Sequence, residues 1–233
     1  MTGSDLPPLP VLQVRTVVVW RHGRTEWNVS GRFQGQLDPP LDEVGREEVA
    51  RSAPMMAAGL PRGATVVVSS DLQRAVDTAA ALTDLLDVPL LREPRLREHG
   101  MGSWEGLTRE EVAERFPDQY AAWISGQPVV DRGGEAPAAV GERALAALVD
   151  LPPADVAVVV THGGTAGRLM ERMLGLEPHQ RRLFAPLTNC AWSELTVQGS
   201  RWRLQRHNVA AFPVAAHPAE NARAPETDAD AVA

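Results

Sequence analysis

Two histidines, His22 and His162, each lie directly before a glycine and directly after an apolar run of the chain. Arg21 precedes the first histidine, and Arg74 follows a third apolar run, which ends at Ser70. An arginine guanidinium is planar, and its forked donors match the oxygens of a phosphoryl group. Two such cations in one cleft repel each other unless an anion lies between them. These residue types therefore predict a phosphoryl-binding site.

Phosphoryl transfer to His22 is the chemistry that this set favours. A neutral imidazole can attack phosphorus and carry it as a covalent phosphohistidine. Arg21, Arg74 and a protonated His162 would then stabilise the charge of the transition state. The glycines after the two histidines would let backbone N–H groups approach the same anion, and Gly164 opens an expected helix whose N-terminus favours negative charge.

Glu98 is the acid expected to act on the leaving group. It follows a short expected strand at 88–91, so it would lie near the same edge of the sheet. A carboxyl group there could protonate the leaving alkoxide and later take a proton from attacking water. The alternative is an ordinary ion pair between Glu98 and Arg95 or Arg97, which the spacing allows.

The elements that must position these residues follow from apolar periodicity. Three β-branched runs, 16–20, 65–70 and 156–161, are apolar on both faces, which is typical of buried parallel strands. An alternating pair, 190–197 and 201–207, predicts an edge hairpin. Expected helices cover 41–60 with a break near Pro54, 71–87, 108–116 behind a Thr108 capping box, 137–151 and 164–174. This order predicts an α/β fold: a three-layer α/β/α sandwich with a mostly parallel sheet and an antiparallel edge.

Composition excludes other kinds of site. The 233 residues carry 23 basic and 30 acidic side chains, a net charge of −7, which argues against general nucleic-acid binding. Every basic residue is an arginine, which excludes lysine chemistry, and one cysteine, Cys190, excludes a disulfide framework and a thiolate metal cluster. The apolar run 17–20 is too short for a signal or membrane segment. The sequence predicts a cytoplasmic protein with one domain over 11–212 and disordered ends at 1–10 and 213–233.

The run Arg21-His22-Gly23-Arg24-Thr25-Glu26-Trp27-Asn28 resembles the histidine phosphatase superfamily, in its phosphoglycerate-mutase-like branch. Further matching segments follow in order: 31–35, Leu41 with Gly45, 69–79, 96–98 with 102–106, 133–135 and 161–164. The resemblance covers about 17–208 and implies that His22 is the phosphorylated nucleophile and Glu98 the proton donor, without a metal or an organic cofactor. The residues expected to bind the phosphoryl group and the substrate are Arg21, Gly23, Asn28, Gln34, Gly35, Arg74, His162 and Gly163.

Within the superfamily, two features favour hydrolysis over mutase activity. Arg24-Thr25 stands where the mutases usually carry Glu-Ser, and the segment from Glu98 to His162 is shorter than theirs. The segments that look most like glucosyl-3-phosphoglycerate phosphatases are 33–38, 189–192 and 201–204. We expect a small phosphorylated metabolite as substrate, of the sugar phosphate or phosphoglycerate type, a lid at 128–132, and no nucleic-acid or membrane partner. The sequence leaves open whether the protein forms a homodimer.

Three alternatives remain at this point. A metal-dependent phosphohydrolase would use His22, His162 and Asp71 as ligands. A phosphoglycerate mutase would depend on a bisphosphoglycerate primer, and a non-catalytic regulatory module would bind a phosphorylated ligand without turnover. Residues expected to lie outside the chemistry are His99, His179, His207 and His217, and the core is expected to take Trp104, Trp123, Trp192 and Trp202.

Overall fold

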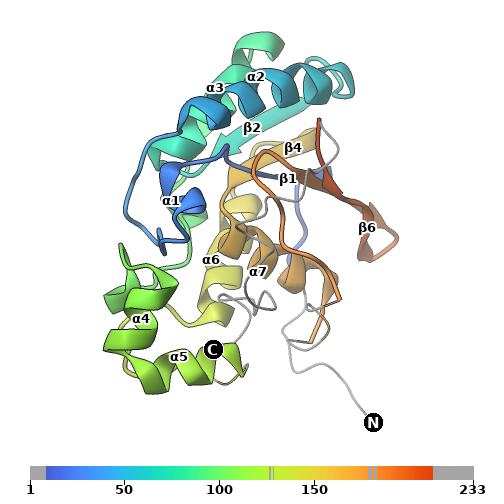
Figure 1. The fold of residues 1–233 in the computed structure, drawn as a ribbon. Coiled ribbons are helices and arrows are strands. Elements are labelled where there is room, and N and C mark those ends of the chain that lie inside the picture. Colours follow the sequence, from blue (N-terminus) through green and yellow to red (C-terminus); the bar gives the residue numbers. More distant parts are fainter. Residues whose placement is uncertain (1–8, 126, 128, 178–179, 181–182, 212–233) are drawn as a thin grey trace.

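The computed structural model describes residues 9–125, 127, 129–177, 180 and 183–211. In this part of the chain, six strands form one sheet in the order β3-β2-β4-β1-β5-β6 (Figure 1). Their bounds are Val14–Arg21 for β1, Thr65–Ser69 for β2, Leu90–Arg92 for β3, Ala154–Thr161 for β4, Trp192–Gln198 for β5 and Arg201–Val209 for β6. Strands β1 to β4 run parallel, and the β5–β6 hairpin is antiparallel at one edge. The predicted sheet is confirmed.

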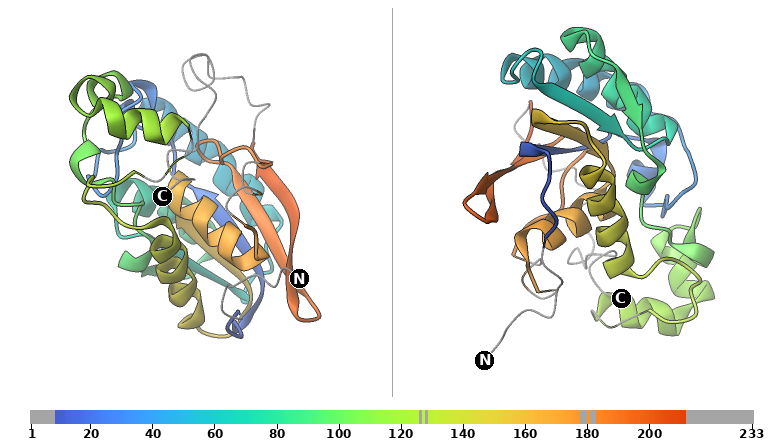
Figure 2. Two further views of the ribbon diagram at one scale, coloured as in Figure 1. Left: turned by 90° about the horizontal axis from the view of Figure 1, so that it is seen from below. Right: turned by 180° about the vertical axis from the view of Figure 1, so that it is seen from behind.

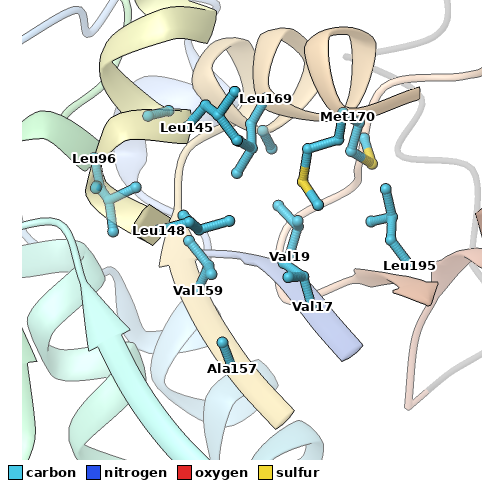
Figure 3. Packing of buried hydrophobic residues seen from close by; sticks show 14 of the residues in the cluster. Val17, Val19, Leu96, Leu145, Leu148, Ala157, Val159, Leu169, Met170 and Leu195 are labelled. Atoms are coloured by element: carbon cyan, nitrogen blue, oxygen red, sulfur yellow. The ribbon is translucent and has the colours of Figure 1, made fainter. Parts of the chain in front are cut away.

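Helices cover both faces of this sheet and complete the three layers (Figures 1 and 2). On one face lie α2, Glu43–Ala58, and α3, Gln73–Leu86; on the other lie α6, Pro137–Val149, and α7, Gly163–Leu174. Val17 and Val19 of β1 pack against α6 and α7 (Figure 3), while Val18 and Trp20 pack towards α2 and α3. Successive side chains of a strand point to opposite faces, so β1 is apolar throughout because both of its faces are buried.

Helix α2 differs from the prediction because it continues through Pro54. Proline removes the hydrogen bond to the carbonyl of Ala50, four residues earlier. Both residues are exposed, so water can donate a hydrogen bond to the carbonyl of Ala50. The buried side chains of Ala53 and Met56 hold the helix on the sheet. The predicted break is therefore wrong.

The remaining helices lie beside the carboxyl edge of the sheet. They are α1, Glu26–Val29; η1, Pro94–Leu96; η2, Gly102–Trp104; α4, Arg109–Arg115; and α5, Pro117–Ile124. The α4–α5 pair protrudes from the layers in Figure 1 and packs around Trp104 and Trp123, whose ring centroids lie 5.9 Å apart. Thr108 caps α4 through the predicted capping box. Trp192 and Trp202 are also buried, so the four tryptophans pack as expected.

Some predictions fall on parts of the chain that are not described. The expected disordered ends lie almost wholly outside the described residues, as do His179 and His217. Residue 128 of the expected lid also lies outside them, and the lid stays a prediction. Within the described residues, no helix is long and apolar enough to cross a membrane.

Candidate active site

His22 leaves the end of β1 with one ring nitrogen already engaged. Its backbone N–H donates to the carbonyl of Thr161 at 3.0 Å, which joins it to the end of β4. The ring is 2% exposed, and its Nδ1 lies 2.7 Å from the carbonyl oxygen of Gly23. A carbonyl only accepts, so Nδ1 must carry the hydrogen, and Nε2 of the neutral ring keeps its lone pair.

The surroundings of His22 keep that ring neutral. Burial, and then the positive charges of Arg74 and Arg21, hold its pKa well below the ordinary value of 6.5. At neutral pH the imidazole is therefore unprotonated, which is the form that can attack phosphorus.

His162 lies beside it at the N-terminus of α7, with the two ring centroids 5.0 Å apart. Its Nε2 lies 2.9 Å from the hydroxyl of Ser70, at the end of β2, and its buried Nδ1 has no hydrogen-bond partner among the described residues. Burial and the charge of Arg74 hold the pKa of His162 well below 6.5. The protein's own groups therefore favour the neutral ring, contrary to the protonated His162 of the prediction, whereas a phosphoryl dianion would favour protonation.

Arg74 is fully buried in the first turn of α3. It donates to the carbonyls of Leu37 at 2.7 Å and Gly35 at 3.0 Å, while its buried Nε has no hydrogen-bond partner among the described residues. Burial lowers the pKa of Arg74 to about 10, against the opposing charges of Glu98 and Asp38, so the guanidinium stays positive at neutral pH.

Arg21, the last residue of β1, lies close enough to both histidines for its charge to lower their pKa values. Its Nη1 donates to the carbonyl of Leu187 at 2.6 Å. A β-carbon at Gly163 would lie 3.6 Å from the centre of this guanidinium, an ordinary contact distance, so the arginine packs against the start of α7. The structure thus brings His22, His162, Arg21 and Arg74 together, as the sequence predicts.

Glu98 reaches the same place from the segment after η1. Its carboxylate accepts hydrogen bonds from the backbone of Thr165 at 2.9 Å and Gly164 at 3.2 Å. The N-terminus of α7 therefore faces a carboxylate of the protein, and the Gly164 amide is not directed at a phosphoryl group as predicted. Arg97 binds Asp71, and Arg95 binds Glu93 and Asp150, so the ion-pair alternative for Glu98 is wrong.

Gly23 has a packing role in place of the predicted anion contact. Its N–H donates to the hydroxyl of Thr78 at 3.1 Å. A β-carbon at Gly23 would lie 2.7 Å from the carbonyl oxygen of Gly45. The two glycines let α2 approach the loop that carries His22, which explains why both belong to the motif.

The predicted substrate residues Asn28, Gln34 and Gly35 differ in their hydrogen-bond partners. Asn28 Oδ1 accepts from the backbone of Thr25 at 3.0 Å within a capping box and from Asn189 at 3.3 Å. Gln34 keeps a buried Oε1 without a hydrogen-bond partner among the described residues. Gly35 has φ +50°, and its carbonyl, rather than its N–H, meets Arg74.

Three supporting residues received no role from the sequence. Asn189 donates to the carbonyl of His22 at 3.1 Å, Thr78 holds the Gly23 amide, and Ser70 meets His162. Thr78 lies one helical turn after Arg74 and bonds its carbonyl at 2.8 Å, a spacing that could have indicated it. Asn189 belongs to the segment 189–192 that the resemblance singled out, but nothing local in the sequence indicated its bond to His22, 167 positions away.

Two other predictions about titratable residues can be assessed. The carboxylate of Asp71 accepts hydrogen bonds from Nε and Nη2 of Arg97, at 2.8 and 2.6 Å. The described residues contain no group of three or more His, Cys, Asp or Glu that could hold a metal ion. The ligand set of the metal-dependent alternative is thus not assembled. His207 is half-buried, and its ring nitrogens lie 2.8 Å from the hydroxyl of Ser193 and 2.7 Å from the carbonyl of Ala185.

Comparison with known proteins gives one consistent group. A family model described as histidine phosphatase superfamily (branch 1) matches residues 17–210. The glucosyl-3-phosphoglycerate phosphatase of Mycolicibacterium vanbaalenii is 34% identical over 221 residues, which cover 86% of this chain and 97% of the relative. The "Probable phosphoglycerate mutase GpmB" of Yersinia enterocolitica is 36% identical over 194 residues, which cover 80% of this chain and 86% of the relative.

A solved structure agrees with these relatives. The structure of a mycobacterial glucosyl-3-phosphoglycerate phosphatase in complex with VO3 has a TM-score of 0.75 and 34% sequence identity, and the match covers 84% of this chain and 100% of that one. The family predicted from the motifs is confirmed: this chain belongs to the histidine phosphatase superfamily.

Proposed function

We propose that this protein is a phosphoric monoester hydrolase that works through a phosphohistidine at His22. The single observation that carries the proposal is the bonding of that ring. Its Nδ1 is held by the carbonyl of Gly23 at 2.7 Å, which leaves Nε2 as an unprotonated nucleophile on a ring that feels the positive charges of Arg74 and Arg21. A histidine with only a structural role would need neither the freed nitrogen nor the cationic surroundings.

The reaction then has two halves. Nε2 of His22 attacks phosphorus, the bond to the leaving oxygen breaks, and Glu98 gives a proton to the alkoxide. Arg21, Arg74 and His162 stabilise the charge on the equatorial oxygens. In the second half, Glu98 takes a proton from water, the hydroxide attacks phosphorus, and inorganic phosphate leaves His22 with its original charge.

The substrate class that we propose is a phosphoglycerate ester of the glucosyl-3-phosphoglycerate type. The relative from Mycolicibacterium vanbaalenii supports it, because the match covers 97% of that phosphatase. The mutase alternative draws on the relative from Yersinia enterocolitica. Against it, Arg24 pairs with Asp42 at 2.8 Å and Thr25 caps α1, so the two residues that replace the usual Glu-Ser have local partners in the fold.

Phosphate release distinguishes these functions. The purified protein should release inorganic phosphate from glucosyl-3-phosphoglycerate without a bisphosphoglycerate primer or an added metal, and vanadate, which mimics pentacoordinate phosphorus, should inhibit competitively. Dependence on the primer with no net phosphate release would establish the mutase. Binding of the substrate without either reaction would establish the regulatory module.

A further inference from the structure

Arg143 of α6 donates hydrogen bonds to several backbone carbonyls of the segment that carries Glu98. Its Nη1 bonds the carbonyls of Arg95 at 2.6 Å and Arg97 at 2.8 Å, and its Nη2 bonds the carbonyl of Glu98 at 3.0 Å. One rigid guanidinium fork thus fixes three carbonyl oxygens within four residues. An irregular segment needs such external partners, because its carbonyls lack the regular bonds of a helix or strand.

Glu135 completes this arrangement from the other side. Its carboxylate accepts hydrogen bonds from Nε and Nη2 of Arg143, at 2.7 and 2.9 Å. It also accepts from the backbone N–H of Gly100 at 2.8 Å and from the side-chain amide of Gln36 at 3.3 Å. Burial would raise the pKa of Glu135, but the bonds from Arg143 and Gly100 outweigh it, so that pKa lies below its ordinary value. The pair is therefore charged, and it spans the backbone on both sides of Glu98.

The side chain of Glu98 is fixed separately by the N-terminus of α7, through Gly164 and Thr165. A proton donor is effective only within hydrogen-bond reach of the leaving oxygen, and a displacement of about 1 Å can cost roughly a hundredfold in rate. We propose that Arg143, held by Glu135, is a positioning residue that aims Glu98 at the leaving oxygen. This inference rests on the proposed function, in which Glu98 is the proton donor.

The test compares two leaving groups in the Arg143→Gln variant. For an alkyl phosphate such as glucosyl-3-phosphoglycerate, kcat/KM should fall by about a hundredfold. For 2,4-dinitrophenyl phosphate, whose leaving group needs no proton, kcat/KM should fall by less than about threefold, because this constant reports formation of the phosphohistidine and not its hydrolysis, which also uses Glu98. Arg172→Gln is the matched control: it removes a more deeply buried arginine that pairs with Glu142 of α6 at 2.5 Å, and it should leave the ratio of the two kcat/KM values unchanged.

A second arm places the same change in a Glu98→Gln background. If Arg143 acts through Glu98, the loss on the alkyl phosphate should almost disappear there, because the donor is already gone. Equal losses for both leaving groups, or a full loss that persists beside Glu98→Gln, would overturn the proposal. If Arg143→Gln does not fold, Glu135→Gln keeps the arginine and should give a smaller loss in the same direction; no leaving-group difference in it would also overturn the proposal.

Failure of the proposed function gives a different result. A Glu98→Gln variant that loses kcat/KM equally on both substrates would show that Glu98 is not the proton donor, whatever Arg143 does. A Glu98→Gln variant with the expected leaving-group difference, beside an Arg143→Gln variant without one, would refute only the positioning role.

Discussion

The ends of β1 and β4 carry the same residue type in nearly the same surroundings, yet their two histidines are bonded in opposite ways. Both rings are buried, and both have a pKa well below 6.5 through burial and Arg74. His22 is held at Nδ1 by the carbonyl of Gly23, whereas His162 is held at Nε2 by the hydroxyl of Ser70. The nitrogen left for the substrate is therefore Nε2 in one ring and Nδ1 in the other.

The hydrogen-bond partners of the two rings explain why the two histidines can have different roles. A carbonyl fixes the tautomer, because it can only accept, so His22 always presents a lone pair at Nε2. A hydroxyl can donate or accept, so His162 can present either a lone pair or a hydrogen at Nδ1. The first arrangement suits a nucleophile, and the second suits a group that changes from neutral to cationic as phosphoryl charge arrives.

The largest expected effect separates the two histidines by substitution. His22→Ala should abolish turnover and covalent labelling by a radioactive phosphate ester, because it removes the Nε2 lone pair that accepts the phosphoryl group. His162→Ala should lower kcat by on the order of 10²–10³, the scale of one lost transition-state donor, and should still become labelled. Quenched labelling reactions and steady-state rates measure both.

The roles would be reversed by the opposite labelling result. A labelled His22→Ala variant, or a His162→Ala variant that can no longer be labelled while it still binds vanadate, would move the nucleophile to the end of β4. Binding of vanadate serves as the control that the pocket persists in each variant.

The next prediction concerns Glu98, whose carboxylate is bound by the N-terminus of α7, the helix that follows His162. Glu98→Ala should lower kcat/KM, which reports formation of the phosphohistidine, by on the order of 10²–10⁴ for an alkyl phosphate and by much less for aryl phosphates. The phosphohistidine should still form from an aryl phosphate, since attack by His22 is not impaired. An equal loss for every leaving group would count against proton donation.

The sequence predicted the residues of this comparison better than their bonds. Three buried strands fixed where His22, His162 and Arg74 converge, because parallel strands place their carboxyl ends at one edge. The partners of the ring nitrogens could not be predicted, since Ser70 meets His162 across 92 positions of the chain. Gly23 was mistaken for an anion contact because a glycine needed for close packing and one needed for an exposed N–H look alike in a sequence.

The contact between Glu98 and the N-terminus of α7 could not be predicted from the sequence for a similar reason. A helix N-terminus after a histidine predicts an anion site, but not whether the anion is a ligand or a side chain. Glu98 supplies it here, from 66 positions away. Pro54 was mispredicted because exposure of a helix face depends on tertiary packing, which decides whether a lost hydrogen bond can be replaced by water.

Ser70→Ala tests a smaller difference between the rings. Without this hydroxyl, Nε2 of His162 loses its partner, and kcat should fall by about tenfold, which corresponds to one hydrogen bond of about 1.4 kcal/mol. Ser69→Ala is the matched control, because Ser69 is equally buried and its hydroxyl donates to the backbone carbonyl of Ser70, at 2.8 Å, in place of a histidine. Identical rates for the two variants would show that Ser70 does not orient His162.

The pH dependence of stability tests the lowered pKa that the two histidines have in common. Their pKa values are well below 6.5 in the folded protein and about 6.5 when unfolded, so below pH 6.5 only the unfolded chain takes up their protons. The unfolded state then binds more protons, and the free energy of unfolding must fall as pH falls, by about 1.4 kcal/mol per pH unit for each histidine. The carboxylates with lowered pKa act only in a more acidic range, because their unfolded values lie near 4.

Urea denaturation between pH 6.5 and 5 measures this slope. In His22→Gln, the contribution of one ring is removed, so the slope should decrease by about 1.4 kcal/mol per pH unit while the share of His162 persists. An unchanged slope would mean that His22 is protonated in the folded protein in this range. The ring would then lack the lone pair at Nε2, and the distinction between the two strand ends would no longer explain which histidine attacks.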